Sequence, residues 1–409
     1  MQFLFNFDIS LTTIILLSTI TLCVIFLLTL YRCRIARIAK HQQACSDSIP
    51  YLPANENDES NIDITSFGNL PTASVIIYAN DETSHLAKLL PQILEQEYST
   101  KFEVVVVNDG TSESTQDLVN ELELQYPNLY YTHTPDRSRN LSRKKLALTI
   151  GIKAARHDVI VLVNANSRIN SPYWLSLMTR NFNDKTDVVI GYATPQPQDD
   201  TSMGRRRRAF DRAAEAVTYL SAAIGKSAYR GFNYNLAYRR SCFFDNKGFS
   251  HSLNLHYGDD DVFINEITNS HNTAVELSSE SIVECHFHGT KETHRILKRR
   301  YSYTSRFIRK GARFFFGFSS LLFWIWALLS IITIILSLPN LLPTAIVAAL
   351  GIALWIPTIL TWRKAMIALK SRRMFITIPW FVMTRPFYNA FYKFNSRRNY
   401  RQNLTWIKR

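Results

Sequence analysis

VVVVNDG at residues 104–110 is the stretch of sequence that decides the fold of the soluble part of this chain. A short run of β-branched residues with no polar residue between them is typical of a parallel strand that is buried on both faces. The Asn-Asp-Gly that follows it consists of residues that dominate turns. The stretch therefore predicts a central strand that ends in a polar loop.

Strands and helices alternate on both sides of this stretch. Residues 74–78 and 159–163 are further short apolar runs, and helical apolar spacing occurs at 86–94, 117–124 and 146–155. This alternation predicts an α/β fold, with a mostly parallel central sheet and helices on both faces. In such sheets ligands bind beyond the carboxyl ends of the strands.

Compact polar residues directly follow each of the three predicted strands. The three segments are Ala-Asn-Asp-Glu at 79–82, Asn-Asp-Gly-Thr-Ser-Glu at 108–113 and Asn-Ala-Asn-Ser at 164–167. One such segment alone is explained equally well as an ordinary turn. Three at the same edge of a sheet indicate a crevice that accommodates a nucleotide.

Three uncharged stretches, at 9–31, 314–338 and 343–362, are long enough to cross a membrane, which takes about 20 apolar residues. A cleaved signal peptide fits the first stretch less well, because the stretch is too long and no basic residue precedes it. Basic residues follow at 32–40 and 363–373. The positive-inside rule therefore places residues 32–313 in the cytosol of a multi-pass protein of the cytoplasmic membrane.

Residues 374–394 are apolar and aromatic, but Arg385, Pro386 and Lys393 interrupt them. This pattern favours a helix that lies in the membrane interface over a fourth crossing. The formal net charge is +14, and the basic clusters lie mostly beside the membrane segments. Membrane lipids are therefore the expected partner of this charge, and nucleic acid is not.

The domain organisation follows from these segments. We expect an N-terminal transmembrane helix at 1–31, a basic segment and polar linker at 32–70, a nucleotide-sugar-binding half-domain at 71–200, an acceptor and catalytic half-domain at 201–313, a transmembrane hairpin at 314–362, and an interfacial helix with a basic tail at 363–409.

Residues 73–301 resemble glycosyltransferase family 2, whose members are inverting enzymes of the Rossmann-like GT-A fold. The first strand with Glu82, and the second strand with Asn108-Asp109-Gly110 in place of Asp-Asp-Gly, carry the first half of the resemblance. The resemblance implies a nucleotide-sugar donor whose nucleoside contacts Asp109, Glu82 and Ala79. Lys144 lies in a segment similar to Gly-Lys-x-x-Ala-Leu and is implied to contact the diphosphate. A solvated lysine on a helix face is the alternative.

Asn164 and Asn166 occupy the positions of the family's Asp-x-Asp motif, which binds a divalent cation that bridges the diphosphate. Carboxylates suit Mg²⁺ and Mn²⁺ because these hard ions prefer charged oxygen ligands. Asparagine supplies a neutral oxygen, so Asn164 is expected to contact the donor and Asn166 is at most a weak metal ligand. Either basic residues neutralise the diphosphate instead, or the site is catalytically impaired.

Gly258-Asp259-Asp260-Asp261 resembles the family's acidic motif, which implies that Asp260 is the general base, with Asp259 beside it. A base is needed to remove the proton of the acceptor hydroxyl as it attacks the anomeric carbon. The alternative is an acidic helix N-terminus. Arg300-Tyr301 matches the end of the Gln-x-x-Arg-Trp motif and is implied to lie near the acceptor and the diphosphate.

Two weaker signals concern basic and metal-ligating residues. The arginines at 205–208 open a helix that reaches about residue 224 and are explained either by lipid headgroups or by solvation. Cys285, His286 and His288 suggest a metal site, because His286 and His288 would share one face of a strand, but no third ligand is evident. The five cysteines are odd in number and lack metal-type spacing, which indicates reduced thiols.

Two functions remain open on this sequence. The first is a membrane-bound transferase that moves a sugar from a nucleotide diphosphate to a lipid-linked or cell-surface glycan acceptor. The second is a catalytically impaired pseudoenzyme that binds a partner or a glycan.

Overall fold

The computed structural model describes residues 10–51, 62–110, 113–135, 142–196, 202–253, 255–286, 291–309, 311–338 and 340–398. The chain divides into two compact units. Unit 1 comprises Met1–Lys40, Thr201–Ser221 and Lys310–Ala390, and unit 2 comprises His41–Asp200, Ala222–Arg309 and Phe391–Arg409.

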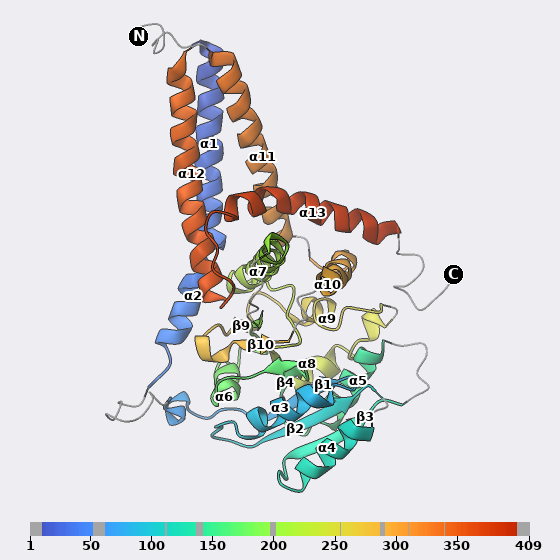
Figure 1. The fold of residues 1–409 in the computed structure, drawn as a ribbon. Helices are drawn as coiled ribbons and strands as arrows, with labels where there is room; N and C mark the ends of the chain where they lie inside the picture. The colour runs from blue at the N-terminus through green and yellow to red at the C-terminus, as the bar shows by residue number, and fades with distance from the viewer. Residues whose placement is uncertain are drawn as a thin grey trace. The chain divides into compact units, whose positions relative to one another are not determined.

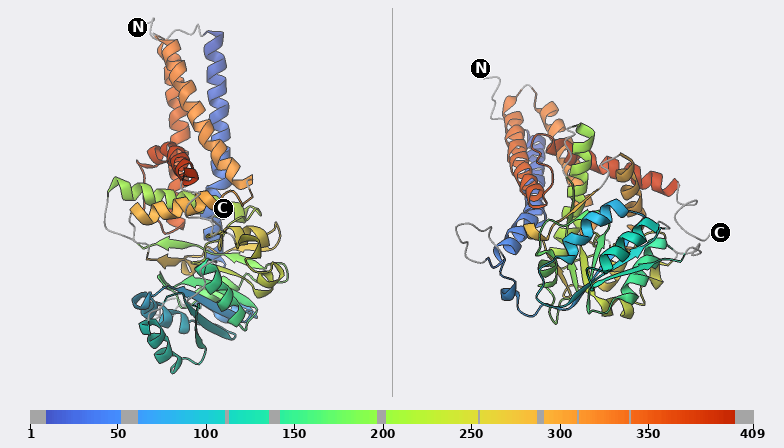
Figure 2. Two further views of the ribbon diagram at one scale, coloured as in Figure 1. Left: turned by 90° about the vertical axis from the view of Figure 1, so that its right-hand side faces the viewer. Right: turned by 60° about the horizontal axis from the view of Figure 1, so that its bottom comes forward.

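Three helices of unit 1 are long and apolar enough to cross a membrane: α1 (Leu11–Arg34), α11 (Gly311–Ser337) and α12 (Leu341–Ala368). They lie side by side as a bundle (Figures 1 and 2). Aromatic contacts join them, including Tyr31 with Phe323 at 5.8 Å between ring centroids. Helices are therefore present at all three of the predicted membrane spans.

Helix α12 starts earlier and ends later than the apolar stretch that predicts it. Its N-cap is Asn340, whose Oδ1 accepts a hydrogen bond from the Leu342 backbone N–H at 3.1 Å. Pro343 is tolerated in the first turn because N–H groups there have no intrahelical acceptor. The helix continues past Trp362 to Ala368, because charged residues end an apolar span without ending a helix.

Helices α7 (Met203–Ile224) and α13 (Ile378–Arg398) also contribute to unit 1. The Phe210 ring lies 5.0 Å from Trp362 and 5.6 Å from Phe381, centroid to centroid. Asp211 Oδ1 is 2.9 Å from Arg385 Nε. Helix α13 runs across the direction of the bundle (Figure 1). It is not among the three described helices that meet the length and apolarity of a membrane span.

The core of unit 2 is a seven-stranded sheet in the order β3-β2-β1-β4-β8-β6-β9. Strand β8 is antiparallel to both of its neighbours, and every other pair in the sheet is parallel. The strands are β1 (Ala73–Ala79), β2 (Phe102–Asn108), β3 (Leu129–His133), β4 (Val159–Asn164), β6 (Val188–Ile190), β8 (Leu236–Arg239) and β9 (Thr273–Val275). The predicted mostly parallel α/β fold is confirmed.

Helices flank this sheet (Figure 1). A second, three-stranded sheet in the order β5-β10-β7 is formed by strands that alternate along the chain with those of the large sheet. The remaining strands are β5 (Ser167–Arg168), β7 (Ala193–Pro195) and β10 (Val283–Cys285). The remaining helices are α2 (Ala36–Asp47), α3 (Thr83–Leu94), α4 (Glu113–Glu123), α5 (Arg143–Ala154), α6 (Trp174–Thr179), α8 (Arg240–Asp245), α9 (Val262–Ile267), α10 (Lys291–Thr304), and the 3₁₀ turns Ile64–Phe67, Ser250–Ser252 and Ser279–Ser281.

Strand β3 has no counterpart among the predicted strands. Only Leu129 is buried in it, and the other residues are half-buried or exposed. An edge strand needs no continuous apolar run, because one side of it meets solvent. The signal used for the central strands is therefore missing from this segment.

Helix α5 packs unusually close to the sheet because Gly151 faces it. A Cβ at Gly151 would lie 2.7 Å from Val107 Cγ2 and 2.8 Å from Ile76 Cγ2. The helix leads into β4, so its N-terminal turn lies at the edge where the parallel strands end. This packing places Arg143, Lys144 and Lys145 beside the polar loops.

Candidate active site

The three predicted polar segments meet at one edge of the sheet. Ala79 at the end of β1 is in register with Asn108 at the end of β2, and Tyr78 is in register with Asn164 at the end of β4. The spatial part of the prediction is therefore confirmed.

Asn108 organises the turn between the first two segments. Its Oδ1 accepts hydrogen bonds from the backbone N–H groups of Asp81 and Gly110, both at 3.3 Å. Gly110 is needed here, because a Cβ at this position would lie 1.9 Å from the Asp81 carboxyl group. The side-chain amide of Asn108 therefore has a structural role, because it holds the backbone of both segments in place.

Asp109 is buried and receives three side-chain hydrogen bonds. Its Oδ1 accepts from Arg143 Nε at 2.9 Å and from Thr134 Oγ1 at 2.8 Å. Its Oδ2 accepts from the Tyr78 hydroxyl at 3.0 Å, and its backbone N–H donates to the Ala79 carbonyl at 2.8 Å. Ala79 itself is buried and contributes through its backbone. Arg143 thus pairs with Asp109 at the position where the similar family motif has a glycine.

Tyr78 connects Asp109 to the lysine of α5, a role that the sequence did not indicate. The Lys144 ammonium lies 5.1 Å from the centroid of the Tyr78 ring, which is within cation–π range. Burial, together with the negative charge of Asp109, raises the pKa of Tyr78 well above its ordinary value. The charges of Asp259 and Glu82 act on the same hydroxyl. Glu82 itself is half-buried at the N-cap position of α3.

Asp259 joins the first half of the site to the second. Its Oδ2 lies 3.5 Å from Lys144 Nζ and accepts a hydrogen bond from Asn233 Nδ2 at 2.8 Å. Its Oδ1 accepts from Arg300 Nη2 at 2.8 Å. Burial opposes ionisation, but Arg300 and Lys144 outweigh it and hold the pKa of Asp259 well below its ordinary range.

Asp260 shares Arg300 with Asp259. Its Oδ1 accepts from Arg300 Nη2 at 2.7 Å, and its Oδ2 accepts from the Tyr301 hydroxyl at 3.3 Å. The Tyr301 ring is covered by Arg230, whose Cζ is 3.3 Å from the ring centroid. Helix α10 therefore supplies two side chains that contact Asp260.

Asp261 differs from the two acids before it, because both of its oxygens serve the local structure. Oδ1 accepts from the Val262 N–H at 2.8 Å and caps α9, while Oδ2 accepts from the Thr304 hydroxyl. Burial, reinforced by the charge of Asp260, raises the pKa of Asp261 to about 6. Of the three acids, Asp261 has the alternative role considered for this motif, that of an acidic residue at the N-terminus of a helix.

A continuous path of contacts therefore joins Asp109 to Asp260. It runs from Asp109 through Tyr78, Lys144 and Asp259 to Arg300 and Asp260, and every link is given above. All of these residues belong to unit 2. Sequence reasoning identified five of the six, and it missed Tyr78 because a tyrosine at the end of a strand is common.

Asn164 and Asn166 lie at the end of β4 and just after it, against the Tyr234 hydroxyl. Burial raises the pKa of Tyr234 to about 12. Asn166 Nδ2 donates to the His286 carbonyl at 3.5 Å, while its Oδ1 is buried without a hydrogen-bond partner. Among the described residues, no three His, Cys, Asp or Glu side chains form a group that holds a metal ion. His288, which was considered as a ligand, lies outside the described residues.

Lys145 is a buried residue that supports the acidic segment. Its ammonium donates to the Ser252 carbonyl at 2.6 Å, the Ser252 hydroxyl at 3.1 Å and the Leu255 carbonyl at 3.1 Å. These bonds attach α5 to the loop that leads into Asp259–Asp261. Burial lowers the pKa of Lys145 to about 8.

The pKa of Lys145 predicts a pH dependence of stability. Between about pH 8 and about pH 10.5 the unfolded lysine holds a proton that the folded one releases, so the free energy of unfolding rises with pH. The full rise is on the order of 3 kcal/mol. Thermal unfolding of Lys145→Met should lack this rise between about pH 7.5 and about pH 9.5, while the exposed Lys153→Met on the same helix retains it. Equal pH profiles for all three proteins would contradict the assignment.

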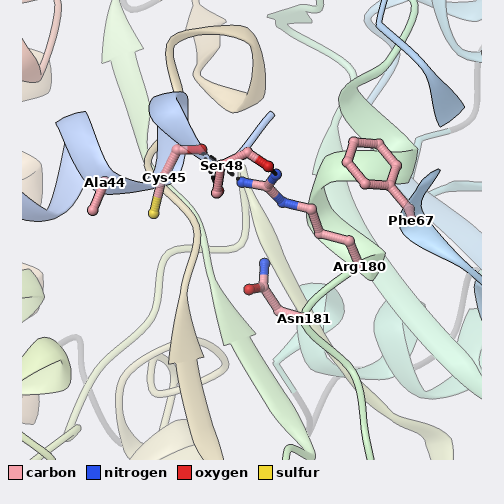
Figure 3. A pocket seen from close by; sticks show the side chains of 6 residues that line it. All are labelled: Ala44, Cys45, Ser48, Phe67, Arg180 and Asn181. Atoms are coloured by element: carbon pink, nitrogen blue, oxygen red, sulfur yellow. Dashed lines mark hydrogen bonds between the residues drawn. The ribbon is translucent and has the colours of Figure 1, made fainter. Parts of the chain in front are cut away.

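A separate hollow of about 380 Å³ lies elsewhere in unit 2, lined by Ala44, Cys45, Ser48, Phe67, Arg180 and Asn181 (Figure 3). Arg180 Nη2 donates to the Cys45 carbonyl at 2.9 Å, and Arg180 Nε is 3.0 Å from Glu276 Oε2. None of the residues predicted for the site lines this hollow. Its contacts attach the end of α2 to the globular domain.

Comparison with known proteins identifies the family of this domain. The family model described as Glycosyl transferase family 2 matches residues 74–249. The Bacillus subtilis (strain 168) protein EpsH, named as a glycosyltransferase, is 23% identical over 171 residues, which cover 42% of this chain and 48% of EpsH. YdaM of the same strain, also named as a glycosyltransferase, is 31% identical over 130 residues, covering 30% of this chain and 29% of YdaM.

A poly-β-1,6-N-acetyl-D-glucosamine synthase of Staphylococcus aureus (strain COL) is 25% identical over 146 residues, covering 35% of this chain and 32% of the synthase. This chain therefore spans about half of the length of EpsH and about a third or less of the other two relatives. Among solved structures, a mannosyltransferase of Pyrobaculum calidifontis in complex with GDP-Man and Mn²⁺ aligns with 86% of this chain and 97% of its own, at 15% identity and a TM-score of 0.49. Residues 74–249 of this chain thus match the model of glycosyltransferase family 2, and the named relatives are glycosyltransferases as well.

Proposed function

We propose that this protein is a membrane-anchored, inverting glycosyltransferase. It moves a sugar from a nucleotide diphosphate donor to a lipid-linked or cell-surface glycan acceptor. The observation that supports this most strongly is the path of contacts between Asp109 and Asp260, which joins a nucleoside-type position to a base-type position across one sheet edge.

The donor binds beyond the ends of β1, β2 and β4. Asp109 and Glu82 accept hydrogen bonds from the nucleoside, beside the backbone of Ala79. Lys144 and Arg300 are part of the path between the two halves of the site, and they offset the charge of the diphosphate. Fixed cations in a partly buried site stabilise a developing phosphate charge well, because they need no reorganisation during the reaction.

Asp260 is the best candidate for the general base among the three adjacent acids. Asp259 is held ionised by two cations and binds protons weakly, so it serves to position Lys144 and Arg300. Both oxygens of Asp261 are used by the helix cap and Thr304. In the proposed reaction Asp260 takes the acceptor's hydroxyl proton, the acceptor oxygen bonds to the anomeric carbon from the face opposite the nucleotide, and the nucleoside diphosphate leaves with the bonding electron pair.

The proposed acceptor follows from the membrane-length helices and the relatives. Three helices are long and apolar enough to cross a membrane, and we propose that they do so. We further propose that unit 2 faces the cytosol of the cytoplasmic membrane, because basic residues follow α1 and the apolar part of α12. One relative is named for synthesis of a polysaccharide. A glycan or a lipid-linked saccharide is the acceptor class that suits both features.

The proposal is tested by incubating the purified full chain with a panel of nucleotide sugars and membrane lipid extract. We expect release of a nucleoside diphosphate with one or a few donors, and release that depends on the extract. The product glycoside should carry the anomeric configuration opposite to that of the donor. Failure of every donor to release nucleotide would contradict the transferase assignment.

A second candidate function is a binding subunit without turnover. It is favoured by one observation: the carboxylates of Asp109 and Asp260 both already have protein hydrogen-bond donors. A ligand would have to replace or share these partners. The same panel separates the two functions, because nucleotide binding without release of product would support the binding subunit.

A further inference from the structure

We infer that this protein binds the donor diphosphate with side-chain cations and without a divalent metal ion, an inference that rests on the proposed transferase function. The family resemblance implies a cation held by carboxylates at positions 164 and 166. The asparagines at these two positions, and the charged side chains of the site, instead fit a diphosphate held by side-chain cations.

The side-chain atoms at positions 164 and 166 are poor ligands for Mg²⁺ or Mn²⁺. Asn164 and Asn166 offer neutral amide oxygens, whereas these ions prefer charged oxygen ligands. The Asn166 backbone carbonyl already accepts the His286 N–H at 2.8 Å, which leaves Asn166 Oδ1 as the one buried, unpartnered oxygen of that residue. Among the described residues, no three His, Cys, Asp or Glu side chains form a group that could hold a metal ion.

The carboxylates of Asp259 and Asp260 already form ion pairs with cations of the protein. Asp259 contacts Lys144 and Arg300, and Asp260 contacts Arg300. A metal ion that drew on Asp259 or Asp260 as a ligand would have to compete with these cations for the same carboxylates. Two positive charges placed beside Lys144 and Arg300 would also be repelled by them.

The charge balance of the site is preserved without a metal. Two carboxylates with one divalent cation sum to zero, and two asparagines without a cation also sum to zero. A site with Asn-x-Asn and no metal therefore presents the same net charge to the diphosphate as a site with Asp-x-Asp and a divalent metal ion. If the metal were retained, the same site would carry two additional positive charges.

Lys144 and Arg300 have the placement that diphosphate binding needs. They approach Asp259 from two different helices, α5 and α10, at 3.5 Å and 2.8 Å. Their side chains are only 19% and 13% exposed, so their positions are restricted before any ligand binds. Arginine supplies a planar set of donors that matches phosphate oxygens, and lysine supplies a compact point charge. Asp259 therefore holds in advance the two cations that receive the diphosphate.

The test measures nucleoside diphosphate binding rather than turnover. The purified full chain, freed of metal with EDTA, is titrated calorimetrically with UDP, GDP, ADP and CDP, and the titrations are repeated with Mn²⁺. We expect at least one nucleotide to bind in EDTA, with an affinity that Mn²⁺ changes by less than about threefold. An affinity that falls about tenfold or more on removal of the metal would overturn the inference and leave the proposed function intact.

Variants separate the contribution of the cations from that of the asparagines. In EDTA, Lys144→Gln should weaken nucleotide binding about tenfold, and the exposed Lys153→Gln on the same helix should leave it unchanged. The double variant Asn164→Asp, Asn166→Asp should bind nucleotide more weakly in EDTA and recover with Mn²⁺, whose binding is followed by electron paramagnetic resonance. Undiminished binding in Lys144→Gln would contradict the role of this cation. Absence of binding by any nucleotide, with or without metal, would overturn the proposed function itself and this inference with it.

Discussion

Asp260→Asn should lower the rate of sugar transfer by roughly 10²–10⁴-fold while nucleotide affinity stays within about threefold of the wild type. The amide retains an oxygen that accepts from Arg300 Nη2, now 2.7 Å from Asp260 Oδ1, so the local structure is expected to persist. What is lost is the capacity to take a proton from the acceptor hydroxyl. The transfer rate at saturating donor and the nucleotide affinity from calorimetry together check this prediction.

The matched control is Asp245→Asn, which changes an exposed acid at the end of α8 and should leave transfer unchanged. Because the prediction separates rate from affinity, it distinguishes a base from a residue that merely supports the fold. Equal transfer by Asp260→Asn and the wild type would remove Asp260 from the mechanism. An equal loss of affinity and rate would instead indicate a binding residue.

Arg300→Met should both abolish transfer and destabilise unit 2. Arg300 Nη2 is within 2.8 Å of Asp259 Oδ1 and 2.7 Å of Asp260 Oδ1, and both acids are almost fully buried. Removing one partner of a buried ionic group typically costs about 3–5 kcal/mol, because the remaining charges lose their counterion without regaining water. The free energy of unfolding, measured by denaturant titration in detergent, checks the size of this effect.

Two further variants make the Arg300 prediction specific. Arg295→Met on the same helix removes an exposed cation and should shift stability by less than about 0.5 kcal/mol. Arg300→Lys keeps the charge but not the planar set of donors, so it should recover stability in part. A wild-type stability for Arg300→Met would show that the contacts among Arg300, Asp259 and Asp260 do not contribute to the folded state.

The layout of unit 2 could be predicted because its central strands carry an unambiguous signal. Residues 75–77, 104–107 and 159–163 are apolar without interruption, and the carboxyl ends of these strands meet because the strands are parallel. This geometry alone brought the polar segments at 79–82, 108–113 and 164–167 together. Motif resemblance then added Lys144, the acids at 259–261 and Arg300, which come from distant parts of the chain.

The contacts within the site could not be predicted, because they depend on side-chain directions that no local pattern specifies. Tyr78 and Asn233 were not among the predicted site residues, yet one bonds Asp109 and the other bonds Asp259. Arg143 stands where the similar motif has glycine, and only the structure shows that it pairs with Asp109. The division of labour among the adjacent acids likewise depends on Thr304, which lies far along the chain from Asp261.

The most direct test of the account is an experimental structure of the full chain with UDP bound in the presence of EDTA. We expect a nucleoside against Asp109 and Glu82, with the diphosphate between Lys144 and Arg300 and no metal density beside Asn166. A nucleotide bound elsewhere on the protein, or at this edge of the sheet with its phosphates directed away from Lys144 and Arg300, would contradict it.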